Sequence, residues 1–95
     1  MEETLREEVN LLHAQMCQAI ADPNRILILY LLSESPRYVS ELADLMAIQQ
    51  PTVSHHLKIL RDRGLVTTTR EGNAIRYELR DPRIVKALDL LEKGG

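Results

Sequence analysis

Apolar residues recur at helical spacing near the start of the chain. Five of them are separated by four, three, four and four positions, with polar residues in between: Leu5, Val9, Leu12, Met16 and Ile20. This spacing places one apolar stripe along an amphipathic helix. We therefore predict a first helix over about residues 3–20.

Two Asp-Pro pairs mark the starts of further helices, because Asp caps a helix and Pro fits its first turn. Asp22-Pro23 precedes ILILYLLSE, a run that is apolar nearly all round and predicts a central helix ending near Pro36. Asp81-Pro82 opens the last helix. Its apolar stripe consists of Ile84, Val85, Leu88 and Leu91.

The middle of the chain predicts two helices joined by a very short turn. A brief helix begins at about Ser40 and runs through ELADLMA, with Leu42, Ala43, Leu45 and Met46 expected to be buried. A longer helix follows over about Gln50–Arg63, with Pro51 in its first turn and Gly64 at its end. Two helices in this arrangement are typical of a helix-turn-helix.

After Gly64 the apolar period changes from 3.6 to 2. Residues 65–70 and 74–79 flank the turn Glu71-Gly72-Asn73, in which Asn73 suits a position of positive φ, and they predict a two-stranded hairpin. The predicted fold is mainly α with a small β-hairpin. It is a winged helix-turn-helix of five helices and a two-stranded wing, forming one domain over residues 1–95.

Composition refines this picture. With 44% hydrophobic and 27% charged residues the chain is an ordinary globular protein, and without Phe or Trp its core must be aliphatic. A domain of 95 residues buries a modest share of its surface, so dimerisation is expected. The acidic start MEETLREE, the single Cys17 and the lack of a long apolar run lead us to expect a cytoplasmic protein without a membrane partner.

Net charge alone argues against a nucleic-acid partner, since it is −2. Its distribution argues the other way. Residues 1–48 hold three Arg against eight acids (−5), residues 49–80 hold six Lys or Arg against three acids (+3), and residues 81–95 hold three of each. One basic stretch therefore lies inside an acidic chain.

The predicted helix 50–63 carries two kinds of side chain on separate faces. Val53, Leu57 and Leu60 share the inward face. Polar residues form an outer stripe with flanking positions: Gln50, Thr52, Ser54, His55, His56, Lys58 and Arg61. Amides and hydroxyls can read base edges in a major groove, and Lys or Arg can meet phosphates. An ordinary solvated helix face is the alternative, but the short preceding helix and the basic hairpin favour nucleic-acid binding.

Four blocks resemble, in order, those of the ArsR family of small bacterial winged-helix repressors. They cover roughly residues 17–80 and read ADPNRILIL, VSELADLM, QQPTVSHHLKILRDRGLV and REGNAIRYEL. The resemblance implies a homodimer whose helix 50–63 enters the major groove and whose wing reaches the neighbouring backbone or minor groove. It also implies a repressor on a palindromic operator that an effector releases.

Carried over residue by residue, the resemblance assigns roles to several positions. Gln50, Thr52, Ser54 and His55 would contact bases, whereas Lys58, Arg61, Arg70 and Arg76 would supply affinity for the backbone. The first and last helices would form the dimer interface through Leu5, Val9, Leu12, Met16, Ile84, Leu88 and Leu91. Two positions depart from the family pattern: Gln49 replaces a common Ser N-cap, and Asn73 replaces a common wing Arg.

Metal and catalytic sites find little support. The helix near Glu41-Leu42 lacks the family's cysteine, and the last helix lacks its histidine. His13 and Cys17, four positions apart, could share a metal ion, although plain packing and solvation explain them better. His55 and His56 point about 100° apart on a helix and do not form a site. We therefore expect no enzyme and no cofactor; an unknown metal or thiol effector stays open, and the main rival is a protein-interaction module.

Overall fold

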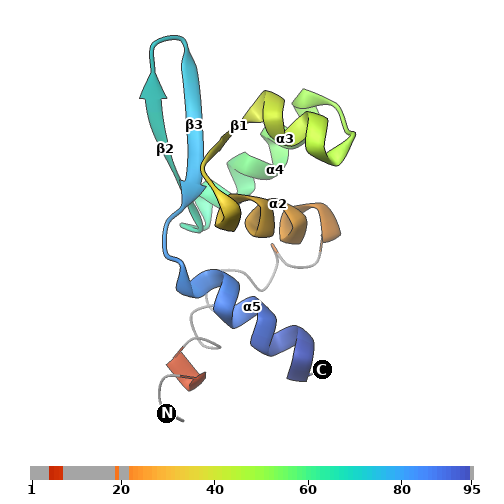
Figure 1. Cartoon of the computed structure of the whole chain (residues 1–95), viewed down its shortest axis with the longest axis vertical. Helices are drawn as coiled ribbons and strands as arrows, with labels where there is room; N and C mark the ends of the chain where they lie inside the picture. The colour runs from red at the N-terminus through yellow and green to blue at the C-terminus, as the bar shows by residue number, and fades with distance from the viewer. Residues whose placement is uncertain (1–4, 8–18, 20–21, 95) are drawn as a thin grey trace.

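The computed structural model describes residues 5–7, 19 and 22–94, with side chains placed up to residue 90. The elements, in chain order, are α2 (Pro23–Glu34), β1 (Arg37–Tyr38), α3 (Val39–Met46), α4 (Gln50–Asp62), β2 (Val66–Glu71), β3 (Ala74–Leu79) and α5 (Arg83–Gly94). Of the first predicted helix, residues 5–7 are described, and they are helical. Figure 1 shows α2 in the middle, with α3, α4 and the hairpin on one side of it and α5 on the other.

The two Asp-Pro pairs begin helices as predicted. The backbone N–H of Asn24 donates to the Asp22 carboxylate at 2.8 Å, and that of Arg83 donates to Asp81 at 2.9 Å. The Arg83 side chain also binds Asp81, and this side-chain hydrogen bond, with the backbone one, lowers the pKa of Asp81. Both caps satisfy N–H groups that a helix leaves without an internal partner.

The sheet has three strands rather than the two expected. Its order is β1-β3-β2, with both pairings antiparallel. The additional strand β1 is Arg37–Tyr38, which pairs with Tyr77 and Arg76 of β3. Two residues are too few to show a period-2 pattern, so the sequence interpretation leaves this segment in the connection between two helices.

The hairpin turn consists of Gly72 and Asn73, because Glu71 pairs with Ala74. Gly72 takes a φ of +60°, whereas Asn73 is not among the residues of positive φ, contrary to the sequence interpretation. A glycine at the first central position is typical of a tight hairpin turn. Gly72 alone therefore provides the left-handed residue at the wing tip.

The core is aliphatic and draws on every helix that the structure describes at length. Its largest fully buried side chains are Ile28, Leu29, Leu42, Val53, Leu57, Leu60, Leu65, Val66, Ile84 and Leu88. Leu45, predicted to be buried, is instead 56% exposed. At about 100° per residue it lies about 105° from the middle of the face formed by Leu42, Ala43 and Met46. The side chain of Leu45 therefore points away from the core and toward solvent.

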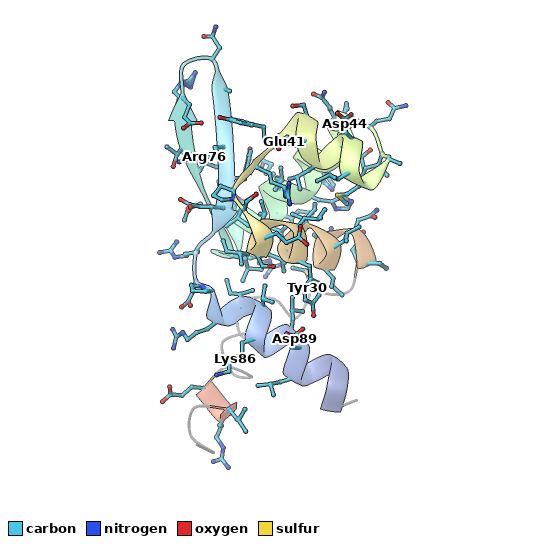
Figure 2. The ribbon with its side chains drawn as sticks, in the orientation of Figure 1. Tyr30, Glu41, Asp44, Arg76, Lys86 and Asp89 are labelled. Atoms are coloured by element: carbon cyan, nitrogen blue, oxygen red, sulfur yellow. The ribbon has the colours of Figure 1, made fainter. Side chains whose placement is uncertain are left out.

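Within the described ranges 5–7, 19 and 22–94, the structure has no helix with the length and apolar character needed to span a membrane. Contact between α2 and α5 includes a polar link, in which the hydroxyl of Tyr30 donates to Asp89 at 2.7 Å (Figure 2). This link fixes α5 against the central helix.

Candidate nucleic-acid interface

Helix α4 is anchored by one face and closed at its C-terminal end. Val53, Leu57 and Leu60 are completely buried, as predicted. At its end the N–H of Gly64 donates to the carbonyl of Arg61 and that of Leu65 to the carbonyl of Leu60, both at 2.9 Å, with Gly64 at φ +76°. This is a Schellman ending, which satisfies the last carbonyls of the helix and directs the chain into β2.

The N-terminus of α4 has no side-chain cap. Gln49 occupies the N-cap position but its side chain makes no capping hydrogen bond. Its backbone carbonyl accepts from Thr52 and Val53 at 3.1 and 3.2 Å. The amide of Gln49 is thus not committed to closing the helix.

The structure places the predicted contact residues of α4 on its solvent side. Exposed side chains at these positions are those of Gln50, Thr52, Ser54, His55, Lys58 and Arg61. Lys58 pairs with Asp62 one turn later at 3.5 Å, and both side chains are more than half exposed. Such a solvated pair is weak, so the ammonium group can exchange Asp62 for another anion.

The wing places its two predicted arginines differently. Arg70 is exposed near the end of β2. Arg76 is half-buried, and its Nη1 lies 3.3 Å from Oε2 of Glu71. Its Nε is enclosed and finds no hydrogen-bond partner within the described part of the chain. Arg76 is therefore partly engaged inside the wing, whereas Arg70 is available to solvent.

A groove of about 640 Å³ separates α4 from the wing. One wall carries polar side chains from α3 and α4, namely Ser40, Gln50 and Ser54. The facing wall carries the hairpin residues Asn73, Ala74, Ile75 and Tyr77, and Tyr38 and Val39 complete the lining. Gln50 and Ser54 are thus the predicted contact residues that face the wing across this groove.

His56 contradicts the sequence interpretation, which put it beside the outer stripe. It is 6% exposed and belongs to the inward side of α4. Its position lies within about 70° of the middle of the face formed by Val53, Leu57 and Leu60, so helical geometry alone could have indicated burial. The prediction was wrong because the polar neighbours of His56 in the sequence were taken to indicate that its side chain is exposed to solvent.

The partner of His56 is Arg25 of α2. Arg25 Nη1 lies 3.2 Å from His56 Nδ1, while its Nε donates to the carbonyl of Ala19 at 3.0 Å. Because a guanidinium has no acceptor, Nδ1 of His56 must accept, which requires a neutral ring in this arrangement. Burial lowers the pKa of His56 in the same direction; the charges of Arg25 and His55 lower it too, while that of Asp22 acts to raise it.

Tyr38 and Glu71 are site residues that the sequence interpretation missed. The Tyr38 hydroxyl donates to Oε1 of Glu71, and this bond is the main cause that raises the pKa of Tyr38. Nothing in the local pattern indicated the contact, since the two residues are 33 positions apart. Tyr38 lines the groove between α4 and the wing, and its hydrogen bond links Glu71 to that groove.

Metal-binding geometry is not found in the described ranges, where no three His, Cys, Asp or Glu side chains gather. The candidates His13 and Cys17 lie outside the described residues. The rings of His55 and His56 are 5.9 Å apart and tilted by 53°, one exposed and one buried. They do not converge on a common point.

The residues predicted for a dimer interface divide into three groups. Leu5 is 40% exposed and accessible to a partner. Ile84 and Leu88 are 1% and 2% exposed within the single chain, so their side chains belong to its own core, and their part in an interface stays a prediction. The others lie outside the described residues or, for Leu91, have no described side chain: Val9, Leu12, Met16 and Leu91.

Comparison with known proteins identifies the family. The model for "bacterial regulatory protein, arsR family" matches residues 22–68, which span α2 to the start of β2. An uncharacterized HTH-type transcriptional regulator of Methanocaldococcus jannaschii, MJ1325, is 36% identical over 81 residues, covering 84% of this chain and 91% of its own. The chain belongs to the ArsR family. The family match covers the helical wall of the groove, whereas the hairpin residues of the facing wall lie beyond residue 68.

One further relative and one solved structure also resemble this chain. The ArsR-family chain is 42% identical over 82 residues to the HTH-type transcriptional repressor SmtB of Mycobacterium tuberculosis, covering 85% of this chain but 61% of SmtB. It therefore spans about 60% of the length of that relative. The solution structure of the homodimeric winged helix-turn-helix DNA-binding domain of Mb0332 from Mycobacterium bovis matches with a TM-score of 0.75 and 27% identity, covering 98% of this chain and 82% of that one.

Proposed function

We propose that this ArsR-family chain is a sequence-specific DNA-binding transcriptional repressor that acts as a homodimer. The observation that carries the proposal is the groove between α4 and the wing, where Gln50 and Ser54 face the hairpin. A surface with exposed amide and hydroxyl groups on a helix, bordered by a basic hairpin, has the chemistry of major-groove reading. The whole of residues 1–95 would serve DNA binding and dimerisation in the cytoplasm.

The side chains divide the work by type. Gln50, Thr52, Ser54 and His55 choose the sequence, because they can donate to or accept from base edges. Lys58, Arg61 and Arg70 hold the phosphate backbone, where charge supplies affinity without sequence preference. Arg76 contributes less charge than its position suggested, since it already faces Glu71.

Dimerisation would join two such surfaces. SmtB is a repressor and the Mb0332 domain is homodimeric, and both resemble this chain. Two α4 helices would then enter successive major grooves about 34 Å apart on a palindromic operator. The helical segment 5–7 and α5 lie at the end of the molecule opposite the wing, and an interface there would keep the groove open to DNA (Figure 1).

An effector that releases the repressor would have to disfavour the DNA-bound dimer. The required coupling is typically about 1–3 kcal/mol. A contact near α5 could deliver it, because α5 packs on α2 through Tyr30 and Asp89, and Arg25 and His56 link α2 to α4.

A mobility-shift titration with DNA from upstream of the gene tests the proposal. At about 50 mM and 200 mM salt the protein should shift DNA, with affinity falling steeply as salt rises because bound counterions are released. Equilibrium sedimentation of the free protein should give twice the chain mass. A protein-interaction module would show no salt-dependent shift at any concentration, and that result would remove the DNA-binding proposal.

A further inference from the structure

The carboxylate of Glu71 joins the three strands of the sheet near the tip of the wing. Glu71 is the last residue of β2, and its two oxygens meet different donors. Oε1 accepts from the hydroxyl of Tyr38, and Oε2 lies 3.3 Å from Nη1 of Arg76. Tyr38 and Arg76 are themselves cross-strand neighbours in β1 and β3. Glu71 thus connects the far end of β2 to the other two strands.

Tyr38 extends this connection to the helix-turn-helix. It is the N-cap residue of α3, and its backbone N–H donates to the carboxylate of Glu41 at 3.0 Å. A shift of Tyr38 would therefore move the start of α3. Figure 2 shows Arg76 on the hairpin and Glu41 on α3, the two sides that Tyr38 joins.

The part of the hairpin beyond Arg76 needs such a connection. β1 pairs only with Tyr77 and Arg76, so residues 70–75 form a two-stranded ribbon that projects past the third strand (Figure 1). A two-stranded ribbon is only marginally stable and twists more than a wider sheet. Ile75 and Asn73, which line the groove, lie on this projecting part.

Charge makes the presence of Glu71 unexpected at a surface that approaches DNA. Its carboxylate lies beside Arg76, and it would repel phosphates if it acted alone. Glu71 and Arg76 are 39% and 37% exposed, so solvent screens but does not remove this repulsion. An acid at this place therefore needs a role other than contact.

We infer that Glu71 is a positioning residue for DNA recognition: held by Tyr38 and Arg76, its carboxylate fixes the wing tip against α3 and sets the width of the groove between wing and α4. The inference rests on the proposed function, because groove width matters only if DNA enters it. Arg76 then supports the wing from within, and Arg70 makes the external phosphate contact.

Glu71→Gln tests the inference through the sign of its effect. In the amide, one of the two carboxylate oxygens is replaced by an NH2 group, which only donates, so the side chain no longer presents a separate acceptor oxygen to each of Tyr38 and Arg76. Loss of one negative charge alone would tighten DNA binding. Loss of wing position should instead weaken binding about two- to fivefold in a fluorescence-anisotropy titration. It should also reduce the dependence on salt by about one phosphate contact.

Glu78→Gln is the matched control, since Glu78 is an acid on β3 that lines a separate groove with Pro36 and Lys86, and Tyr38 does not line that groove. It should leave binding unchanged or slightly tighter. Tyr38→Phe removes the hydroxyl without changing charge and should weaken binding as Glu71→Gln does. The double variant should be no weaker than either single variant, because the two changes break one link. Circular dichroism should show all four folded.

Two failures can be told apart. If the wild-type chain does not bind DNA at low salt, the proposed function itself is lost. If the wild type binds and Glu71→Gln binds equally well or more tightly, the positioning role of Glu71 is overturned while DNA binding stands. Additive losses for Tyr38→Phe and Glu71→Gln would also overturn it, because each residue would then act alone.

Discussion

At the scale of single residues, the chemistry of α4 depends on which side each polar group faces. His55 and His56 are neighbours in sequence, yet the side chain of His55 is exposed, whereas that of His56 is buried beside Arg25 with 6% of its surface exposed. His56 accepts from a permanent cation, so its ring stays neutral in the fold. Its neighbour is free to meet solvent or a ligand. Identical side chains thus take opposite roles one position apart.

The stability of the protein should fall between neutral and mildly acidic pH because of His56. Its folded pKa lies below the ordinary value of 6.5, so in this range the unfolded chain binds more protons than the folded one. The stabilisation is complete above about pH 6.5 and is lost as pH falls toward the folded pKa, at a slope of at most about 1.4 kcal/mol per pH unit. Urea unfolding at pH 7.5, 6.5 and 5.5 measures it.

His56→Gln keeps an acceptor for Arg25 but does not titrate, so it should flatten this dependence on pH. His55→Gln is the control and should preserve the slope, because its side chain is exposed. Equal slopes in the wild type and His56→Gln would show that His56 does not couple folding to protons.

Gln50 and Lys58 should differ in how their loss affects DNA binding. Gln50 faces the wing across the groove, whereas Lys58 lies on the solvent side beside Asp62. Gln50→Ala should reduce discrimination against a wrong base by about 1–3 kcal/mol; Lys58→Ala should weaken all sequences alike and lower the salt slope by about one. Competition titrations with single-base operator variants distinguish the two. Unchanged base preference in Gln50→Ala would exclude it from base reading.

At the scale of elements, the ends of the helices show how local signals build the helix-turn-helix. Asp22, Asp81 and Gly64 occupy the cap positions that their residue types favour. Ala47 does not. It ends α3 in the left-handed region at φ +56°. Its backbone N–H donates to the backbone carbonyl of Asp44 at 3.3 Å, and the N–H of Ile48 donates to the carbonyl of Ala43 at 3.2 Å. The turn between the two helices therefore contains a strained alanine.

Ala47→Gly should stabilise the protein by about 1 kcal/mol, because glycine adopts a positive φ without the steric cost that a Cβ brings. Ala74→Gly makes the same chemical change on β3, where no positive φ is required, and should destabilise by about 0.5–1 kcal/mol. Thermal unfolding of both variants gives the comparison. A loss of stability in Ala47→Gly would show that the alanine at this turn is not strained.

At the scale of the whole molecule, one aliphatic core holds α4 and the wing in a fixed relation. Leu57 and Leu60 of α4 share this core with Leu65 and Val66 at the start of β2. α5 adds Ile84 and Leu88 from the other side of α2. The same packing that presents the outer face of α4 also buries Ile84 and Leu88 within the chain.

Leu57→Ala should cost about 2–5 kcal/mol, because it opens a cavity in a site that is completely buried. That is a large share of the roughly 5–15 kcal/mol that stabilises a domain. Leu45→Ala removes the same atoms from a side chain that is 56% exposed and should change stability little. Urea unfolding at pH 7.5 compares them; a large loss for Leu45→Ala would mean that a partner covers it.

The sequence by itself determined the order and the approximate bounds of the helices and the hairpin from Pro23 onward. These follow from short-range signals, namely apolar spacing, Asp-Pro caps and Gly64, that operate within a turn or two of chain. The outer face of α4 was predicted for the same reason, since helical spacing fixes which residues share a side. Family resemblance then added the roles that spacing could not assign.

Only the tertiary structure decided which polar groups meet. Arg25 and His56 are 31 positions apart, and Tyr38 and Glu71 are 33 positions apart, so no local pattern relates them. β1 exists because β3 offers it a partner, and Leu45 is exposed because the core packs against another face of α3. Periodicity specifies the direction of a side chain on its own helix or strand, whereas its neighbour depends on how the elements pack together.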